Sequence, residues 1–277
     1  MMNRTPEQLY LDLIKKTLSF TLWPEPPMPL SLNHLQPGLK RFMVYTVSKV
    51  LGRVGLLLAV TRSNVQEGQR IEGQIWPGYA DTMIGLKRLD NLQHCIETVL
   101  TEGVSGDFIE TGVWRGGACI LMRAVLAVYR IDDRRVFVAD SFEGLPPPDE
   151  NKYPADKGEV LHKNAYLAVS RAEVENNFRK YGLLDDQVVF LQGWFRDTLA
   201  RAPIESLSIL RLDGDMYGST MESLESLYPR LSKGGFCIVD DYALPSCGMA
   251  VDDYRKKHQI DSEMKAIDWT GIHWRKE

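Results

Sequence analysis

The stretch Phe108-Ile-Glu-Thr-Gly-Val-Trp-Arg-Gly-Gly117 joins a short apolar run to a helical pattern through a turn that is rich in glycine. Glycine lets the backbone approach a ligand closely, and the first turn of the following helix offers free N–H groups. The pattern is not G-x-G-x-x-G, and a plain strand-to-helix turn is the alternative interpretation. The stretch favours an open α/β sheet that binds a ligand at the carboxyl ends of its strands.

Short apolar runs and helical patterns alternate downstream of this turn, which predicts a parallel sheet covered by helices on both faces. The predicted strands are Asp107–Thr111, Arg135–Asp140, Gln187–Gln192, Leu207–Asp213 and Gly235–Asp240. The predicted helices are Ala118–Tyr129, Arg171–Tyr181, Met221–Leu231 and Gly248–His258. The last two segments, Glu263–Ile267 and Gly271–Arg275, flank a short turn and predict a closing antiparallel hairpin.

The residues before Gly106 follow a different pattern, in which helical segments dominate. Helices are predicted at Pro6–Leu18, Gly38–Leu58 and Gly85–Glu102, with a polar loop at Arg62–Asp81. We therefore divide the chain into an N-terminal helical cap and lid region, 1–105, and a ligand-binding domain, 106–277.

The most apolar stretch, 42–60, carries Lys49 and Arg53 and is a poor candidate for a membrane span. An amphipathic helix that covers a pocket or a partner subunit fits it better, and peripheral contact with a membrane is the alternative. The apolar N-terminal helices also favour a homo-oligomer.

Composition narrows the classes of function. The chain has 277 residues, a formal net charge of −4 and no basic run, which argues against a nucleic-acid partner. The four cysteines are widely spaced without a C-x-x-C pair and are expected to be buried reduced thiols. Glu7 and Asp12 interrupt the apolar residues at the start of the chain, so this segment does not resemble a signal peptide. These features together predict a cytoplasmic protein.

A nucleoside site is predicted one strand beyond the glycine turn. The second strand ends at Asp140, followed by Ser141, and an acid at this point can bind a ribose diol. Alone, Asp140 is explained equally well as a helix N-cap or an exposed loop acid. Gly193-Trp194 follows the third strand. The Trp194 ring is suited to packing against adenine, and the alternative is that it belongs to the hydrophobic core. The polar segment Pro146–Leu167 is predicted to be a mobile loop bordering this site.

Four carboxylates follow the fourth and fifth strands, in Leu212-Asp-Gly-Asp215 and Val239-Asp-Asp241. Neighbouring parallel strands bring these acids to one edge of the sheet, where they repel one another unless a cation is bound. Oxygen ligands at this density suit Mg²⁺, with other divalent cations as alternatives. A metal would activate a hydroxyl, and Asp215 is a candidate base. Single acids among them are also suited to capping the helices that follow.

Many segments in this order resemble the macrocin-type O-methyltransferases, which methylate sugar hydroxyls of natural products. The matching segments are Asp81-Thr-Met-Ile-Gly85, Arg88-Leu-Asp-Asn-Leu92, Gly106-Asp-Phe-Ile-Glu-Thr-Gly112, Arg115-Gly-Gly-Ala118, Ala139-Asp-Ser-Phe142, Tyr181-Gly-Leu-Leu184, Gly193-Trp-Phe195, Leu212-Asp-Gly-Asp215 and Val239-Asp-Asp-Tyr242. The resemblance implies a class I methyltransferase fold, with a Rossmann-like, mostly parallel seven-stranded sheet. It also implies transfer of a methyl group from S-adenosylmethionine to a hydroxyl of a sugar or another vicinal diol.

The resemblance implies a role for each group of site residues. Mg²⁺ is assigned to Asp213, Asp240 and Asp241, and the catalytic base to Asp215. The expected S-adenosylmethionine-binding residues are Met83, Glu110, Thr111, Gly112, Val113, Ala118, Asp140, Ser141, Gly193, Trp194 and Asp213. The family closes a lid over its site, and Gln74–Tyr79, with Trp76 and Tyr79, is the nearest segment here.

Three other functions remain as alternatives at this point. A nucleotide-dependent oxidoreductase would use the same sheet but lacks its glycine motif and does not explain the acidic cluster. A catechol O-methyltransferase would carry Asn in place of Asp241 and a Lys after the first ligand, where this chain has Met216 and Tyr217. A non-catalytic binding module would not need the complete acidic set.

Overall fold

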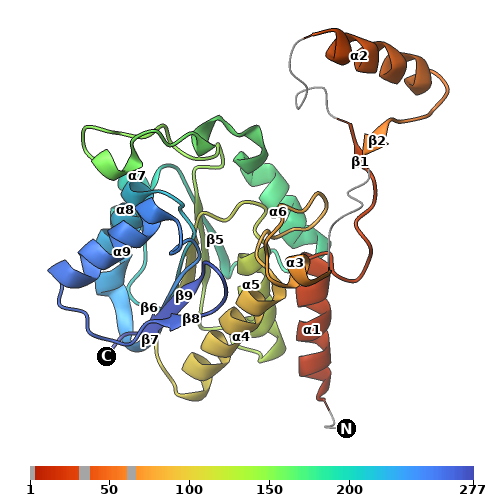
Figure 1. Ribbon diagram of the computed structural model, residues 1–277. Coiled ribbons are helices and arrows are strands. Elements are labelled where there is room, and N and C mark those ends of the chain that lie inside the picture. The colour runs from red at the N-terminus through yellow and green to blue at the C-terminus, as the bar shows by residue number, and fades with distance from the viewer. Residues whose placement is uncertain (1–3, 31–37, 61–66) are drawn as a thin grey trace.

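A computed structural model describes residues 4–30, 38–60 and 67–277 of the chain (Figure 1). At its centre lies a seven-stranded sheet with the strand order β5-β4-β3-β6-β7-β9-β8. Strands β3 to β7 are parallel, whereas β9 pairs antiparallel with both β7 and β8. The strands are β3 (Asp107–Thr111), β4 (Val136–Asp140), β5 (Val188–Gln192), β6 (Leu207–Leu212), β7 (Leu231–Val239), β8 (Lys265–Ala266) and β9 (Ile272–Arg275). The predicted mixed sheet and closing hairpin are confirmed.

The central strands read as continuous apolar runs because helices cover both faces of the sheet. Every residue of β6 is buried, including the charged Arg211. The chain leaves β3 toward β4 on one side, while β6 pairs with β3 on the other. A crevice forms at such a switch point, outside the carboxyl ends of the strands. The register aligns these ends, since Thr111 pairs with Leu212 and Leu212 with Val239.

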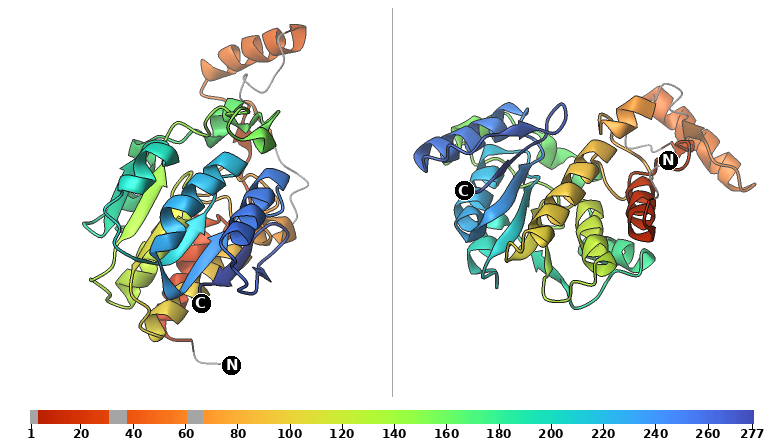
Figure 2. Two further views of the ribbon diagram at one scale, coloured as in Figure 1. Left: turned by 90° about the vertical axis from the view of Figure 1, so that its left-hand side faces the viewer. Right: turned by 90° about the horizontal axis from the view of Figure 1, so that it is seen from below.

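Helices cover both faces of the sheet (Figure 2). A hydrophobic core lies on each face. One contains buried residues of α1 (Pro6–Leu18), α4 (Leu86–Thr101), α5 (Gly117–Val128) and α6 (Arg171–Lys180). The other contains residues of α8 (Tyr217–Leu227) and α9 (Pro245–Lys257), next to the short α7 (Phe195–Thr198). Helices α1 and α4, from the N-terminal region, therefore share a core with α5.

Helix α1 has the predicted boundaries, which local chemistry explains. The Thr5 hydroxyl oxygen accepts a hydrogen bond from the Gln8 N–H, and the Gln8 side-chain oxygen accepts one from the Thr5 N–H. Pro6 occupies the first turn. Helix α8, by contrast, begins at Tyr217 rather than at the predicted Met221. Its first N–H groups are satisfied by Asp156, which is far away in the sequence.

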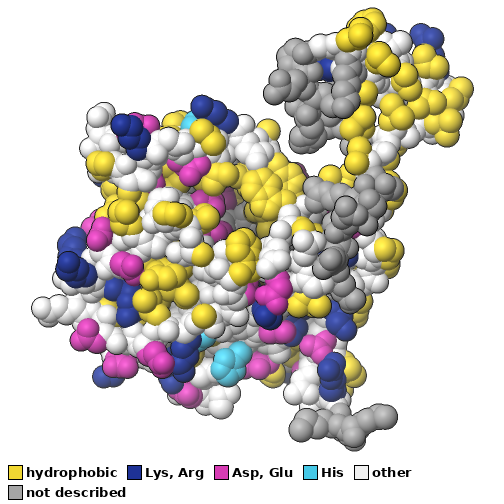
Figure 3. Space-filling view, viewed as in Figure 1, with side chains coloured by type: hydrophobic (Ala, Val, Ile, Leu, Met, Phe, Trp, Pro, Cys, Tyr) yellow, Lys and Arg dark blue, Asp and Glu magenta, His cyan; other side chains and the backbone are white. Residues whose placement is uncertain are grey.

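Helix α2 (Leu39–Gly52) stands apart from the rest of the molecule, on a ribbon formed by β1 (Met28–Pro29) and β2 (Ala59–Val60) (Figure 1). The prediction extended this helix to Leu58, but it ends at Gly52. Its apolar side chains are largely exposed, with Leu39 at 76% and Phe42 at 65% (Figure 3). A group of exposed apolar side chains of this kind is unusual on a folded protein.

Two predicted loops contain short helices. The segment 62–81 includes α3 (Glu67–Ile71), which is too short to produce apolar periodicity. Residues 62–66 of this segment lie outside the described residues. The segment 146–167 includes three 3₁₀ turns and the buried Asp156, and its Pro146 and Leu167 border the cleft described below.

All four cysteines are buried free thiols, as predicted. Within the described ranges, each helix is either too short or too polar to cross a membrane.

Candidate active site

A cleft opens where β3, β4, β5 and β6 end, at the switch point of the sheet. It contains about 730 Å³ of empty space, part of which is open solvent. The predicted site residues that line it are Met83, Gly112, Asp140, Ser141, Gly193, Trp194, Asp213 and Asp215. The structure thus brings together residues from the glycine turn, three further strand ends and the N-terminal region.

Four predicted cofactor-binding residues lie behind the wall of the cleft, namely Glu110, Thr111, Val113 and Ala118. Glu110 is 2% exposed and is paired with Arg211, and Cys119 donates a hydrogen bond to it over 2.9 Å. Direct contact between these four side chains and a cofactor stays a prediction. Their backbone and packing shape the glycine turn.

Gly112 brings the ends of β3 and β6 into close contact. Its φ of +85° lies in the left-handed region, and a Cβ atom there would collide with the carbonyl oxygen of Asp213. Beside it, Asp140 accepts hydrogen bonds from the backbone N–H groups of Val113 and Phe142, each over 2.8 Å. Burial raises the pKa of Asp140, against the effect of these hydrogen bonds. The Ser141 hydroxyl also donates a hydrogen bond to Asp140 Oδ1 over 3.4 Å.

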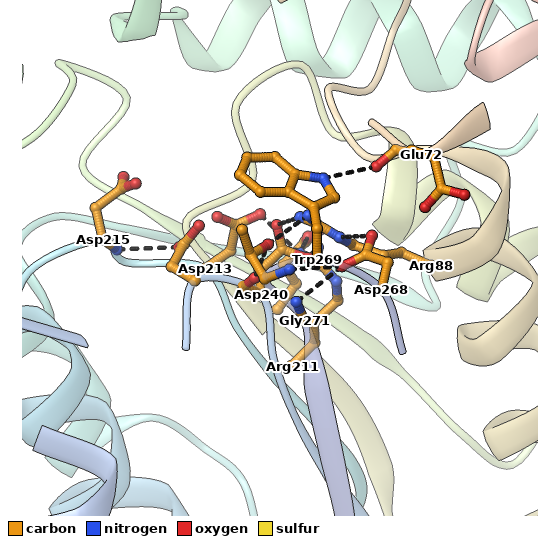
Figure 4. Close-up of polar contacts among 12 residues, drawn as sticks. Glu72, Arg88, Arg211, Asp213, Asp215, Asp240, Asp268, Trp269 and Gly271 are labelled. Carbon is orange, nitrogen blue, oxygen red and sulfur yellow. Dashed lines mark hydrogen bonds and ion pairs between the residues drawn. The ribbon is translucent and has the colours of Figure 1, made fainter. Parts of the chain in front are cut away.

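The predicted metal ligands meet at the carboxyl ends of β6 and β7 (Figure 4). Asp213, Asp240 and Asp241 each offer one carboxylate oxygen, and these oxygens lie within 4.8 Å of one another. Asp215 is held nearby by a hydrogen bond of 3.2 Å from its N–H to Asp241 Oδ2. Its φ of +56° places it in the left-handed region, which Asp tolerates better than most residues.

Two buried arginines neutralise part of this acidic cluster. Arg211 of β6 is paired with Glu110, Asp213 and Asp240. Arg88 of α4 is paired with Asp240 and with Asp268. Although burial opposes the charge of each, the neighbouring carboxylates raise the pKa of both arginines.

The two arginines do not balance all the carboxylates of this cluster, and Asp215 and Asp241 are the ones left over. Among the described residues, Asp215 and Asp241 form no ion pair with a basic side chain. Burial, together with Asp213 and Asp240, raises the pKa of Asp215 to about 7. Burial, together with Asp215 and Asp213, raises the pKa of Asp241 well above its usual range. Converging hard oxygen atoms whose charge is uncompensated are suited to a divalent cation.

Sequence reasoning missed the two arginines and part of the cleft wall. Arg211 had a usable signal, because a charged residue inside the apolar run Leu207–Leu212 needs a buried acidic partner. The cleft residues Leu145 and Arg196 follow strand ends, where lining residues are expected. Glu222 lies inside a helix, and nothing in the sequence pattern marks it.

The segment predicted to act as the lid contacts both the loop 146–167 and the glycine turn. Trp76 stacks on Tyr166 at 5.4 Å between ring centroids, while the Tyr79 hydroxyl donates to the Pro27 carbonyl. Arg115 donates to the carbonyl groups of Gly78 and Ala80. Arg115 therefore connects this segment to the turn after β3.

Comparison with known proteins identifies the family. The profile of the family described as Macrocin-O-methyltransferase (TylF) matches residues 7–276. The chain belongs to this family. Demethyldecarbamoylnovobiocin O-methyltransferase of Streptomyces niveus is 46% identical over 270 residues, which cover 97% of this chain and 93% of that protein. Mycinamicin III 3''-O-methyltransferase of Micromonospora griseorubida is 46% identical over 275 residues, which cover 98% of each chain.

A solved structure supports the same assignment. The structure of the O-methyltransferase NovP has a TM-score of 0.83 and 45% identity to this chain, and covers 98% of this chain and 99% of its own. The macrocin O-methyltransferase family and the class I methyltransferase fold, both inferred from the sequence, are confirmed. The chain is therefore an O-methyltransferase, and the oxidoreductase alternative is set aside.

Proposed function

We propose that this macrocin-family enzyme transfers a methyl group from S-adenosylmethionine to a sugar hydroxyl of a glycosylated natural product, with the help of a divalent metal. The observation that carries the proposal is the convergence of Asp213, Asp240 and Asp241 beside a cleft at the switch point of the sheet. The two sites share Asp213, which lines the cleft and offers an oxygen atom to the cluster. A reacting oxygen held at the cluster would therefore lie next to the bound cofactor.

The glycine turn and the neighbouring strand ends hold the cofactor in this proposal. Gly112 allows close approach of the backbone, and Asp140 and Ser141 face the cleft where a ribose diol would lie. Trp194 and Met83 supply apolar surface to the same cleft. The chief task of these residues is to align the methyl donor with the acceptor oxygen, since the electrophile belongs to the cofactor.

The acidic cluster activates the acceptor. Asp213, Asp240 and Asp241 hold the metal, and Mg²⁺ fits their hard oxygen atoms best. When bound, the cation supplies Lewis acidity that weakens the O–H bond of the acceptor. Asp215, with a pKa of about 7, is placed to accept the proton at a carboxylate oxygen.

The acceptor class is proposed from the relatives. One is named for the 3''-hydroxyl of mycinamicin III, and another for the 4'-position of a rhamnosyl group on tetracenomycin C. Purified enzyme with methyl-labelled S-adenosylmethionine should label glycosides of the mycinamicin, novobiocin or tetracenomycin type. Labelling of simple catechols with no labelling of any glycoside would contradict the sugar acceptor and favour the phenolic alternative.

The N-terminal residues 1–105 act as a cap in this proposal, with α1 and α4 packed on the sheet domain and Met83 lining the cleft. The exposed apolar side chains of α2 support a role in covering the acceptor or a partner subunit, and hence a homo-oligomer. A cytoplasmic location is consistent with four reduced thiols.

A further inference from the structure

Arg88, at the start of α4, contacts two other segments with its single guanidinium group (Figure 4). Nη1 donates to Asp240 Oδ2 at the end of β7, and Nη2 donates to the hydroxyl of Thr270. Nε donates to Asp268 Oδ2 over 2.7 Å. Arg88 is 7% exposed, so these three donors are satisfied by protein groups rather than by bulk water. The planar guanidinium is suited to several fixed acceptors at once, which an ammonium group cannot match.

The turn between β8 and β9 is built to receive this arginine. Asp268 Oδ1 accepts hydrogen bonds from the backbone N–H groups of Thr270, at 3.0 Å, and Gly271, at 2.8 Å. The Thr270 hydroxyl donates to the backbone carbonyl of Asp240 over 2.8 Å. The turn therefore holds both Arg88 and the main chain of Asp240.

Asp240 is fixed from its other side as well. Arg211 donates to Oδ1 while Arg88 donates to Oδ2, so rotation of the carboxylate in either direction breaks a hydrogen bond. One lone pair on each oxygen remains for a further ligand. The orientation set by the two arginines is the one in which Asp240 converges with Asp213 and Asp241.

We infer that Arg88 and the hairpin turn 268–271 position Asp240 for metal binding. This inference rests on the metal site proposed above and assigns these residues a task outside the cleft. Partners of this kind orient ligand carboxylates and typically affect metal affinity by about 10–100-fold. Arg88 touches no reacting atom and is a positioning residue.

The same turn connects the acidic cluster to the N-terminal region. The Trp269 ring lies 6.0 Å from the Arg88 guanidinium, and its Nε1 donates to the Glu72 carbonyl over 2.9 Å. Gly73 packs directly against the backbone of Gly85, which precedes α4 and Arg88. The position of Asp240 thus depends on the segment that also supplies Met83 to the cleft.

Titration calorimetry with Mn²⁺, in the presence of S-adenosylhomocysteine, tests the inference. Thr270→Val removes one acceptor of Arg88 and one donor to Asp240 without a change of charge. Arg88→Lys keeps the charge but cannot span the three acceptors. Both variants should bind Mn²⁺ about 10–100-fold more weakly than the wild type, with unchanged affinity for S-adenosylhomocysteine.

Arg123→Lys is the matched control, because Arg123 of α5 is another buried arginine, paired at 3.0 Å with Asp185 in the loop before β5. It should lower the melting temperature but leave Mn²⁺ affinity unchanged. If folded Thr270→Val or Arg88→Lys protein binds Mn²⁺ within twofold of the wild type, the inference is wrong. A wild type that binds no divalent cation would instead overturn the proposed metal site, and the inference with it.

Discussion

At the scale of single residues, Asp215 is the proposed base, and its removal should affect the chemical step. Asp215→Asn keeps the size of the side chain but cannot accept the acceptor's proton, so kcat should fall by about 10²–10⁴-fold. The affinity for S-adenosylhomocysteine should remain that of the wild type. Transfer of labelled methyl groups, together with calorimetry on the same samples, measures both quantities.

The exposed Asp186 provides the control for this substitution, since Asp186→Asn removes a charge far from the cleft. That variant should keep wild-type kcat. A normal kcat in Asp215→Asn would show that another group accepts the proton.

The raised pKa values predict how stability depends on pH. Burial, together with Asp213, raises the pKa of Asp215 to about 7 in the folded protein, whereas an Asp in the unfolded chain has a pKa of about 4. The folded state therefore binds more protons between these values, and the free energy of unfolding falls as pH rises through that window. With EDTA present, the melting temperature should decrease between pH 5 and pH 8, as measured by differential scanning calorimetry.

Divalent cation should counteract this loss where the carboxylates are ionised. Mg²⁺ should raise the melting temperature more at pH 8 than at pH 5, because protonated carboxyls bind it poorly. An equal effect of Mg²⁺ at both pH values would argue against binding at these acids.

At the scale of elements, the start of α8 depends on Asp156, which is 2% exposed. Its two oxygens accept hydrogen bonds from the N–H groups of Tyr217, at 2.7 Å, and Gly218, at 2.9 Å. Asp156→Ala leaves both groups unsatisfied and should reduce the free energy of unfolding by about 1–3 kcal/mol. Urea unfolding measures this loss. Asp156→Asn keeps one acceptor oxygen, so its free energy of unfolding should fall by less than that of Asp156→Ala. Equal decreases in the two variants would contradict the capping role.

Some of these elements and contacts could be predicted from the sequence, and others could not. Strand ends and their acids were predictable, because Asp140, Asp213 and Asp240 each follow an apolar run directly. The start of α8 was not, because its cap comes from a residue 61 positions earlier than Tyr217. The partners of the buried arginines were equally hidden, since Arg88 and Asp240 are 152 positions apart. Local patterns identify elements, whereas these contacts depend on the folded arrangement.

At the scale of the whole molecule, the cap and the sheet domain share a core through α1. Leu11 is fully buried in the cluster that also contains residues of α5. Leu11→Ala should therefore destabilise the protein by about 2–5 kcal/mol while unfolding stays a single transition in urea. Leu9, on the same helix but 54% exposed, is the control, and Leu9→Ala should change stability by less than about 0.5 kcal/mol. A separate early transition in Leu11→Ala would mean that α1 folds independently of the sheet.

The whole enzyme, as we propose, methylates its acceptor with the help of a metal at the acidic cluster. The most direct measurement is methyl transfer to a glycoside acceptor by enzyme dialysed against EDTA, before and after Mg²⁺ is restored. We predict that activity is lost in EDTA and returns with Mg²⁺, and that Asp241→Asn weakens the response to Mg²⁺. An unchanged rate of methyl transfer in EDTA would contradict the account, even though the enzyme would remain a member of its family.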